Sequence, residues 1–274
     1  MDKSPNSKSN FSGLGNNLYT FAFAEDPNLG ARKTMEDFTI VEPHLTSNGE
    51  WGLFVILDGH GGSQIAEYAK HNYPRVLRDI LEKNKTEQNI KGLIEQSINK
   101  LSEEMLALKD HEAGSTFCAL LINSATKVYY VINIGDSSMV RIQVTDDGKN
   151  KIDKQNLTVE HKITNSDEIK RIKAVNGLMN NRVGGQLLVT RALGDFAFQT
   201  YGLTCEPDIT EHHIAREKYI LIGSDGVWDV IDSEQTQIII EQNGDKPIKD
   251  LVESFMEDAK LKSIDNISLI GLKF

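Results

Sequence analysis

The sequence contains very little cysteine. Only two of its 274 residues are cysteines, Cys118 and Cys205, and neither belongs to a Cys-x-x-Cys motif. One pair in a chain of this length does not form a disulfide framework, which favours a reducing compartment. We therefore expect a cytoplasmic protein, with the nucleus as an alternative, and two thiols that take no part in its chemistry.

Zinc-binding patterns and long apolar segments are also missing. There are seven histidines, but the absence of His-Glu-x-x-His and of paired Cys-x-x-Cys motifs argues against a zinc site. No apolar run approaches the ~20 residues that span a bilayer. Residues 1–13 contain no apolar core of a secretory signal. We therefore expect no membrane-spanning segment and no secretory signal.

Basic residues are outnumbered by acidic ones. The chain has 30 Lys and Arg against 40 Asp and Glu, a formal net charge of −10. Such a protein repels nucleic acids and anionic membranes at long range, so we expect neither as a main partner. An acidic protein that binds an anionic substrate needs bound cations, because these invert the local field.

The distribution of polar and apolar residues predicts one domain after a short tail. Residues 1–17 are rich in Ser, Asn, Gly and Lys, which predicts a flexible N-terminal tail. No linker, repeat or break in composition follows, so residues 18–274 are expected to form a single domain. Short apolar runs predict buried strands at residues 51–57, 117–122, 128–134, 139–144, 187–189, 219–222 and 267–274.

Between these strands, apolar residues recur with helical spacing. This spacing predicts helices at residues 63–83, 89–108, 166–175, 233–242 and 248–261. We expect Pro74 to kink or break the first helix and Ser233 to cap the fourth. Early strands, two long helices, many strands and then more helices favour an α+β fold, with a strand-rich core faced by helices on both sides.

Carboxylates stand at the ends of several predicted strands. Asp58 follows residues 51–57, Asp136 follows residues 128–134, Asp225 follows residues 219–222, and Asp265 precedes the last strand. Any one Asp-Gly pair is explained by a turn. The combination of Asp-Gly-His-Gly-Gly, Asp-Gly-Val-Trp-Asp and Asp-Asn at different strand ends is poorly explained in that way.

If these strand ends converge, several carboxylates meet in one place. Ionised carboxylates packed together repel one another and raise each other's pKa, so divalent cations among them would stabilise the cluster. Ligands that are all oxygen select hard cations, Mg²⁺ or Mn²⁺. Water bound to such an ion is a nucleophile once it loses a proton.

At these residues the sequence resembles the PPM family of metal-dependent protein phosphatases, also called the PP2C-like family. The matching segments occur in the family's order from about residue 20 to the end of the chain. They are GARKTMED (30–37), FVILDGHGG (54–62), AGSTFCALLI (113–122), NIGDSSM (133–139), VTRALGD (189–195), GSDGVWDV (223–230) and IDNISLI (264–270). The resemblance implies an α–β–β–α sandwich of two central, mostly antiparallel sheets flanked by helices.

The resemblance also implies the metal ligands. Asp58 is similar to the catalytic carboxylate that bridges two Mg²⁺ or Mn²⁺ ions. Asp225 and Asp265 resemble the other ligands of one ion, and Glu36 and the Gly59 carbonyl resemble those of the second, partly through water. Asp136, together with Asp225, is similar to residues that hold a weaker third ion in some members.

Two further residues complete the implied machinery. Arg32 is similar to the catalytic arginine that binds the substrate phosphate, a role that suits its bidentate fork. His60 resembles the general acid for the leaving alkoxide. The implied function is a metal-dependent serine/threonine phosphoprotein phosphatase that hydrolyses phosphomonoesters by direct attack of a metal-bridging water or hydroxide. The implied partners are phosphorylated proteins, and we expect a monomer.

Several departures and alternatives remain open in the sequence. Ser138 stands where the family often has Arg, Glu160 and Ile163 flank a family His-Lys pair in place of Asp and Pro, and Asn176 replaces a Gly. Asp195 could support a metal ligand or begin a helix, whereas His161 is expected to have only a surface or structural role. The alternative functions are an inactive binding scaffold, which should have lost a ligand, and a hydrolase of small phosphate esters.

Overall fold

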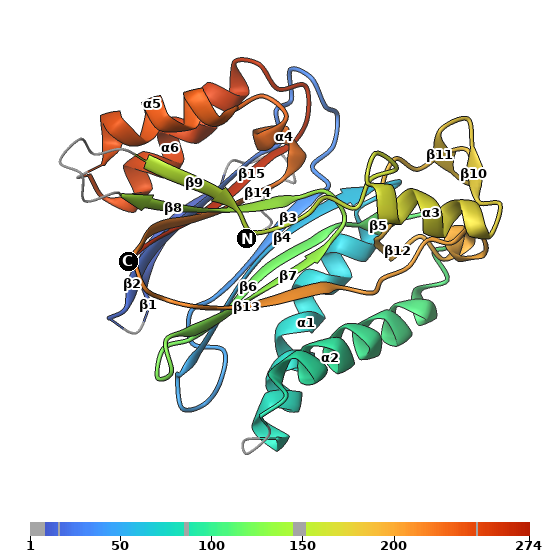
Figure 1. Ribbon diagram of the computed structural model, residues 1–274, viewed down its shortest axis with the longest axis horizontal. Coiled ribbons are helices and arrows are strands. Elements are labelled where there is room, and N and C mark those ends of the chain that lie inside the picture. The colour runs from blue at the N-terminus through green and yellow to red at the C-terminus, as the bar shows by residue number, and fades with distance from the viewer. Residues whose placement is uncertain (1–8, 16, 85–87, 145–151, 245) are drawn as a thin grey trace.

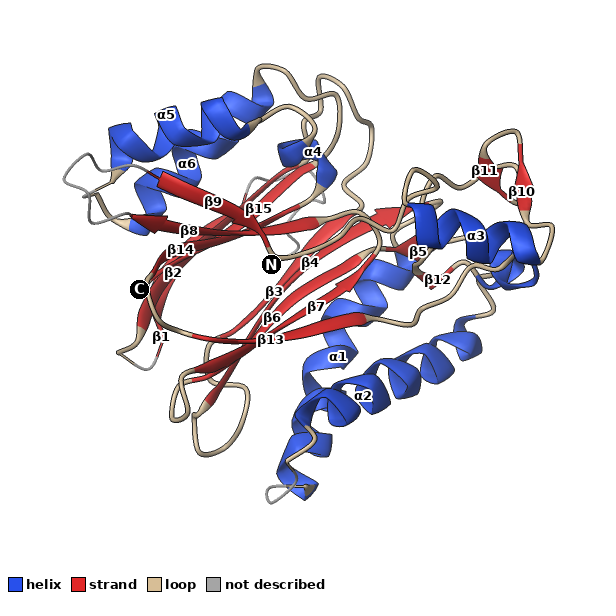
Figure 2. Cartoon of the chain, in the orientation of Figure 1, coloured by secondary structure: helices blue, strands red, loops and turns tan. Residues whose placement is uncertain are grey.

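Two sheets face each other at the centre of the structure, and pairs of helices cover both outer faces (Figure 1, Figure 2). The computed structural model describes residues 9–15, 17–84, 88–144, 152–244 and 246–274. The expected α–β–β–α sandwich is confirmed. No helix among the described residues is long and apolar enough to cross a membrane.

The first sheet has six strands in the order β1-β2-β15-β14-β8-β9, and every neighbouring pair is antiparallel. These strands are β1 (Ser9–Gly15), β2 (Tyr19–Asp26), β15 (Ile267–Lys273), β14 (Glu217–Gly223), β8 (Ser138–Val144) and β9 (Ile152–Asn156). Helices α5 (Ser233–Asn243) and α6 (Ile248–Lys260) cover its outer face (Figure 1). The short α4 (Asp225–Trp228) follows β14.

The second sheet has seven strands in the order β12-β5-β4-β6-β7-β13, with β3 also paired to β4. They are β12 (Leu193–Gly194), β5 (Gly114–Ser115), β4 (Trp51–His60), β6 (Phe117–Asn123), β7 (Val128–Ile134), β13 (Asp208–His213) and β3 (Asp37–Glu42). Its outer face is covered by α1 (Gln64–Lys83) and α2 (Ile90–Met105), which ends in η1 (Leu106–Leu108) (Figure 2).

The apolar run of β4 is continuous because both faces of the strand are buried. Phe54 and Ile56 lie in the core between the sheets. Leu53, Val55 and Leu57 lie in the core between this sheet and α1–α2. A strand buried on both faces needs apolar side chains at every position, which is why this segment could be predicted as a strand.

A smaller unit, which we call the flap, comprises residues 163–204. It contains α3 (Ser166–Ala174), the hairpin β10 (Leu178–Met179) and β11 (Arg182–Val183), and η2 (Phe196–Tyr201). Its own small core includes Ile172, Val183 and Phe198. The prediction of a strand at residues 187–189 is wrong, because Leu187 and Val189 each form only an isolated β-bridge.

Three other local expectations differ from the structure. Of the two effects expected of Pro74, a kink or a break, the break does not occur, since helix α1 continues through it. Tyr73, Val76 and Leu77 are fully buried on either side of it, and their burial outweighs the ~3 kcal/mol cost of an interior proline. The N-cap of α5 is Asp232, not Ser233, and its Oδ1 accepts a hydrogen bond from the Gln235 N–H at 2.8 Å.

The third difference concerns the expected tail, residues 1–17. Residues 9–15 form β1 and pair with β2 in register from Ser9↔Glu25 to Gly15↔Tyr19. The backbone can hydrogen-bond to a sheet edge whatever its side chains are, so a polar composition did not reveal this strand. Residues 1–8 and 16 lie outside the described residues.

Candidate active site

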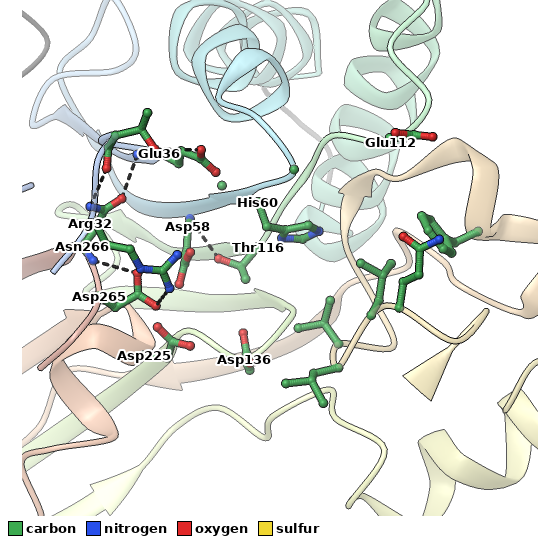
Figure 3. Close-up of a pocket in the computed structure, with 18 of the residues that line it drawn as sticks. Arg32, Glu36, Asp58, His60, Glu112, Thr116, Asp136, Asp225, Asp265 and Asn266 are labelled. Carbon is green, nitrogen blue, oxygen red and sulfur yellow. Dashed lines mark hydrogen bonds and ion pairs between the residues drawn. The ribbon is translucent and has the colours of Figure 1, made fainter. Parts of the chain in front are cut away.

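One cavity of about 460 Å³ gathers every residue that the sequence singled out for catalysis or metal binding. It lies where strand ends of both sheets meet beneath the flap (Figure 3). The predicted residues that line it are Arg32, Glu36, Asp58, Gly59, His60, Asp136, Asp225 and Asp265. From the flap, Arg182, Gln186, Leu187, Leu188, Val189 and Phe198 form the opposite wall.

Strand β4 places Asp58, Gly59 and His60 at the cavity. The Asp58 N–H donates to Thr116 Oγ1 at 3.1 Å, and the Thr116 N–H donates to the Asp58 carbonyl at 2.9 Å. Gly59 donates its N–H to the Glu36 carbonyl at 3.1 Å. A Cβ at Gly59 would lie 2.5 Å from that oxygen, so only glycine lets the Glu36 segment approach β4 this closely.

Asn266, which the sequence analysis did not single out, holds the Arg32–Glu36 loop in place. Its Nδ2 donates to the carbonyls of Pro27 and Thr34, both at 2.9 Å, and its Oδ1 accepts from the Glu36 N–H at 2.9 Å. One buried amide thus ties the start of β15 to the loop before β3. This contact also sets Glu36 and Asp265 on the same side of the cavity (Figure 3).

The carboxylates repel one another. Burial, followed by the charges of Asp37, Asp225, Asp136 and Asp265, raises the pKa of Asp58 well above its usual range. Burial and the charges of Asp136 and Asp265 raise the pKa of Asp225 to about 6. Asp37, which pairs with Asp58 across β3 and β4, has a pKa of about 7, raised mainly by burial. The sequence analysis did not include Asp37 in the site.

The donor chemistry of the cavity fits hard divalent cations. Among the described residues, no three His, Cys, Asp or Glu side chains gather on one point closely enough to form a closed metal site. However, the carboxylates that line the cavity face one space and their charges are unfavourable together. Asp37, paired with Asp58 but outside the cavity lining, has a buried Oδ2 with no hydrogen-bond partner in the described chain. All of these donors are oxygens, which suits Mg²⁺ or Mn²⁺.

Arg32 lies at the mouth of the cavity beside Asp265. Its Nη2 forms an ion pair with Asp265 Oδ2, and its Nε donates to the Ile264 carbonyl at 3.2 Å. The Arg32 side chain is half exposed, so its guanidinium can reach an anion entering from solvent. A guanidinium bound to a carboxylate can exchange that partner for a phosphate of similar geometry.

His60 is paired with a carboxylate from the other side of the cavity. His60 Nε2 lies 2.6 Å from Oδ2 of Asp195, which is fully buried. Burial alone would lower the pKa of His60, but the hydrogen bond and charge of Asp195 raise it above its usual value. Burial also raises the pKa of Asp195, and His60 partly offsets this. We regard the pair as an ion pair, because its short contact stabilises both charges.

Asp195 stands at the start of a helical segment, one of the two roles that its sequence left open, but its carboxylate contacts His60 rather than a predicted metal ligand. It is the residue before η2, with a φ of 48°, but its side chain makes no capping bond. The carboxylate is directed to His60 instead. The VTRALGD segment marked Asp195 as notable, but no local pattern connects it to a histidine in another strand.

Comparisons with known proteins point to one family. The family model described as "Protein phosphatase 2C" matches residues 21–264. "Protein phosphatase 2C homolog 2" of Saccharomyces cerevisiae is 32% identical over 223 residues, covering 75% of this chain and 46% of that protein. "Probable protein phosphatase 2C 59" of Arabidopsis thaliana is 30% identical over 268 residues, covering 94% of this chain and 81% of that protein.

A solved structure shares the fold. The crystal structure of serine-threonine phosphatase 2C from Toxoplasma gondii superposes with a TM-score of 0.73 at 22% identity, covering 97% of this chain and 99% of that one. The chain spans about half the length of the first curated relatives it matches, 46% and 49%. The family match over residues 21–264 and the relatives that share most of the chain show that this chain belongs to the protein phosphatase 2C family.

Proposed function

We propose that the protein is a Mg²⁺- or Mn²⁺-dependent serine/threonine phosphoprotein phosphatase. The observation that carries this proposal is the meeting, in one cavity, of a mutually repelling carboxylate cluster with Arg32 and the His60–Asp195 pair. Family membership supports it. An inactive scaffold should have lost part of this set, and no predicted ligand is replaced.

The residues that would hold two ions are Asp58 between them, Asp225 and Asp265 on one, and Glu36 and the Gly59 carbonyl on the other. Asp136 would share a weaker third ion with Asp225. When bound, these ions neutralise the carboxylates and supply an activated water for attack on phosphorus. Burial of the carboxylates in an otherwise acidic chain supports this assignment, because bound cations remove the repulsion that raises their pKa values.

The chain's own side chains would bind the phosphate and handle the proton. Arg32 would exchange Asp265 for two phosphate oxygens, which fixes the ester in the cavity. His60, kept protonated by Asp195 at Nε2, would donate its Nδ1 proton to the departing serine or threonine oxygen. A positioned general acid of this kind contributes about 10²–10⁴-fold in rate.

The substrate class follows from the walls of the cavity. The carboxylate side would repel a free acidic substrate until ions are bound, whereas the flap side presents Leu187, Leu188 and Val189. Leu188 is half exposed and offers apolar contact to residues beside a phosphoserine or phosphothreonine. We further propose that the enzyme acts as a monomer in a reducing compartment, the cytoplasm or nucleus, which the two free cysteines support.

The direct test is hydrolysis of a phosphothreonine peptide with Mn²⁺, with Mg²⁺ and in excess EDTA. We expect turnover with either ion and none in EDTA. Full turnover in EDTA, with no residual metal by elemental analysis, would overturn the proposal. Turnover of p-nitrophenyl phosphate without any turnover of phosphopeptides would instead indicate a hydrolase of small phosphate esters.

A further inference from the structure

His161 connects three parts of the molecule, although it does not line the cavity. It is almost completely buried, with 1% of its surface exposed. Its backbone N–H donates to the Gly135 carbonyl at 2.9 Å, and its ring Nδ1 accepts from the Gly135 N–H at 3.1 Å. Its carbonyl accepts from the Thr190 N–H of the flap at 2.8 Å. Its Nε2 lies 3.0 Å from Oδ2 of Asp208, in β13.

These contacts determine the tautomer of His161. A backbone N–H can only donate, so Nδ1 must carry the lone pair that accepts from Gly135. The ring hydrogen is therefore on Nε2, where it is donated to Asp208. Asp208 thus fixes which nitrogen faces Gly135, as a carboxylate fixes the ring of a metal-ligating histidine.

The contact with Asp208 continues into a charge network centred on the buried Glu168 of the flap. Arg191 Nη1 donates to Asp208 Oδ1 at 3.0 Å, and Arg191 Nη2 donates to Glu168 Oε1 at 2.7 Å. Glu168, on α3, also accepts from Arg171 and from Thr190 Oγ1, both at 2.6 Å. Although burial opposes ionisation, these donors hold the pKa of Glu168 at about 2.

At its other end, the network reaches the residue before Asp136. Gly135 has a φ of +101°, and a Cβ there would lie 2.7 Å from Thr116 Cγ2, so no other residue fits this position. Its N–H and carbonyl are both bonded to His161, which leaves the backbone of Gly135 in one orientation. Asp136 is the next residue, is 8% exposed and lines the cavity.

We propose that His161 is a positioning residue for Asp136, and that it joins the charge network centred on Glu168 to the weakest of the divalent-ion sites. This inference rests on the proposed function, in which Asp136 is an ion ligand. His161 touches neither substrate nor ion. It acts by holding Gly135, and through Gly135 it sets where the Asp136 carboxylate lies.

Two substitutions of His161 separate positioning from packing. In His161→Asn, the amide oxygen takes the place of Nδ1 and can still accept from Gly135, but it cannot reach Asp208. In His161→Gln, the amide takes the place of Nε2 and can still bond to Asp208, but it cannot reach Gly135. Both variants lose ring volume from the same buried site, so a purely structural role predicts similar losses.

The readout is Mn²⁺ binding by isothermal titration calorimetry, with the melting temperature in metal-free buffer as the measure of folding. We expect His161→Gln to lower the affinity for the most weakly bound Mn²⁺ roughly 10-fold. This is the lower end of the loss expected when a residue that orients a metal ligand is removed. His161→Asn should keep that affinity within roughly 3-fold. His212→Gln, which removes a histidine stacked on Tyr129, is the matched control and should change nothing.

A double-mutant cycle with Asp136→Asn completes the test. If His161 acts through Asp136, adding His161→Gln to Asp136→Asn should weaken Mn²⁺ binding no further, because coupled residues are not additive. The inference would be overturned if the two substitutions lowered Mn²⁺ affinity independently, so that their effects multiplied in the double variant. Equal losses of Mn²⁺ affinity in His161→Asn and His161→Gln would also overturn it. If Asp136→Asn itself leaves Mn²⁺ binding unchanged, the ligand role of Asp136 fails, and the inference falls with it.

If His161→Gln does not fold, Asp208→Ala provides the test from the other end of the hydrogen bond. The Asp208 side chain is half exposed, so its removal leaves no buried cavity. The substitution frees the His161 ring to change tautomer. We therefore expect the affinity for the most weakly bound Mn²⁺ to fall roughly 3-fold. Unchanged Mn²⁺ affinity in a folded Asp208→Ala protein would overturn the inference.

Discussion

His60 and Asp195 are 135 positions apart in the chain, yet His60 Nε2 and Asp195 Oδ2 lie within 2.6 Å of each other. His60 ends β4, whereas Asp195 follows β12 at the base of the flap. The carboxylate is fully buried and the imidazole is only partly so. The pair therefore has a fixed, enclosed partner on one side and a proton available to the cavity on the other.

The leaving group of the substrate should reveal the role of His60. A serine or threonine alkoxide must be protonated as it departs, whereas nitrophenolate is stable as an anion. We therefore expect His60→Gln to slow a phosphothreonine peptide by about 10²–10⁴-fold and p-nitrophenyl phosphate far less. Steady-state kinetics on both substrates at saturating Mn²⁺ would measure this.

Asp195→Asn is the companion variant for that experiment. It keeps an oxygen near His60 but removes the charge that holds the imidazole protonated, so it should show the same substrate preference to a smaller degree. Equal losses on both substrates in His60→Gln, with unchanged Mn²⁺ affinity, would mean that His60 orients the phosphate and that another group supplies the proton.

Removing one carboxylate should relieve repulsion in the metal-free protein. The pKa of Asp225 is raised to about 6 by burial and by its acidic neighbours. Asp225→Asn should therefore melt at the same or a higher temperature than the parent in EDTA. With Mn²⁺ at 100 times its Kd, the free energy of unfolding of the parent should rise by about 2.7 kcal/mol. That of the variant should rise much less.

Differential scanning calorimetry at pH 7.5, with and without Mn²⁺, would measure both effects. Asp153→Asn, at an exposed position of β9, makes the same change in net charge away from the cavity and serves as the control. If Mn²⁺ stabilised Asp225→Asn as much as the parent, Asp225 would not be a ligand.

The free energy of unfolding in metal-free buffer should fall as the pH rises. Asp37, with a pKa of about 7, and Asp225, with a pKa of about 6, bind protons in the folded state that the unfolded chain has already lost. Their contribution is fully present below about pH 4 and is lost by about pH 7. Urea denaturation between these limits would measure the slope.

Asp37→Asn should flatten this slope, because it removes the group with the higher pKa. Glu168 changes the free energy of unfolding in the opposite direction, because its pKa is lowered to about 2. Its stabilising contribution is lost only as the pH falls below about 4.5. Between about pH 5 and 7, Glu168 therefore does not contribute to the slope. A stability that rises across that range would show that the carboxylates do not repel one another in solution.

Lys162 should compete with an ion at Asp136. Its Nζ lies 3.2 Å from Asp136 Oδ2 and 3.4 Å from Glu160 Oε2. Lys162→Met removes this internal cation, so the weakest Mn²⁺ should bind more tightly, by roughly fivefold for an ion pair of ~1 kcal/mol. Calorimetric titration would detect the change, with the exposed Lys170→Met as control. Weaker Mn²⁺ binding would instead mean that Lys162 helps to hold Asp136 in place.

The parts of the fold that could be predicted are those whose signal is local. The β4 segment reads as a strand because each face has its own apolar core, and helices α1 and α2 carry wide apolar stripes. Strands β1, β9 and β13 were not predicted, because Asn10, Asp153 and Glu211 give their segments a polar character. β1 and β9 pair with the adjoining strands β2 and β8, whereas β13 pairs with β7, which lies far from it in the chain.

The same distinction applies to the site. Asp58, Asp136, Asp225 and Asp265 could be proposed because each stands at the end of an apolar run. The contacts of Asp195 with His60 and of Asn266 with the Glu36 loop could not, because both depend on long-range packing. His161 was assigned only a surface or structural role, since no nearby residue indicates that Gly135 and Asp208 meet its two ring nitrogens.

The placement of the carboxylates on opposite sheets has a mechanical consequence. Asp58 lies near the end of β4 in the second sheet, and Asp225 and Asp265 adjoin strands of the first. Asp136 lies where the chain passes from β7 to β8. Ions bound among them would cross-link the two sheets at this end of the sandwich. Pulling the sheets apart would then have to break coordination bonds before it exposed the apolar layer between them, so the loaded protein should open at this end last.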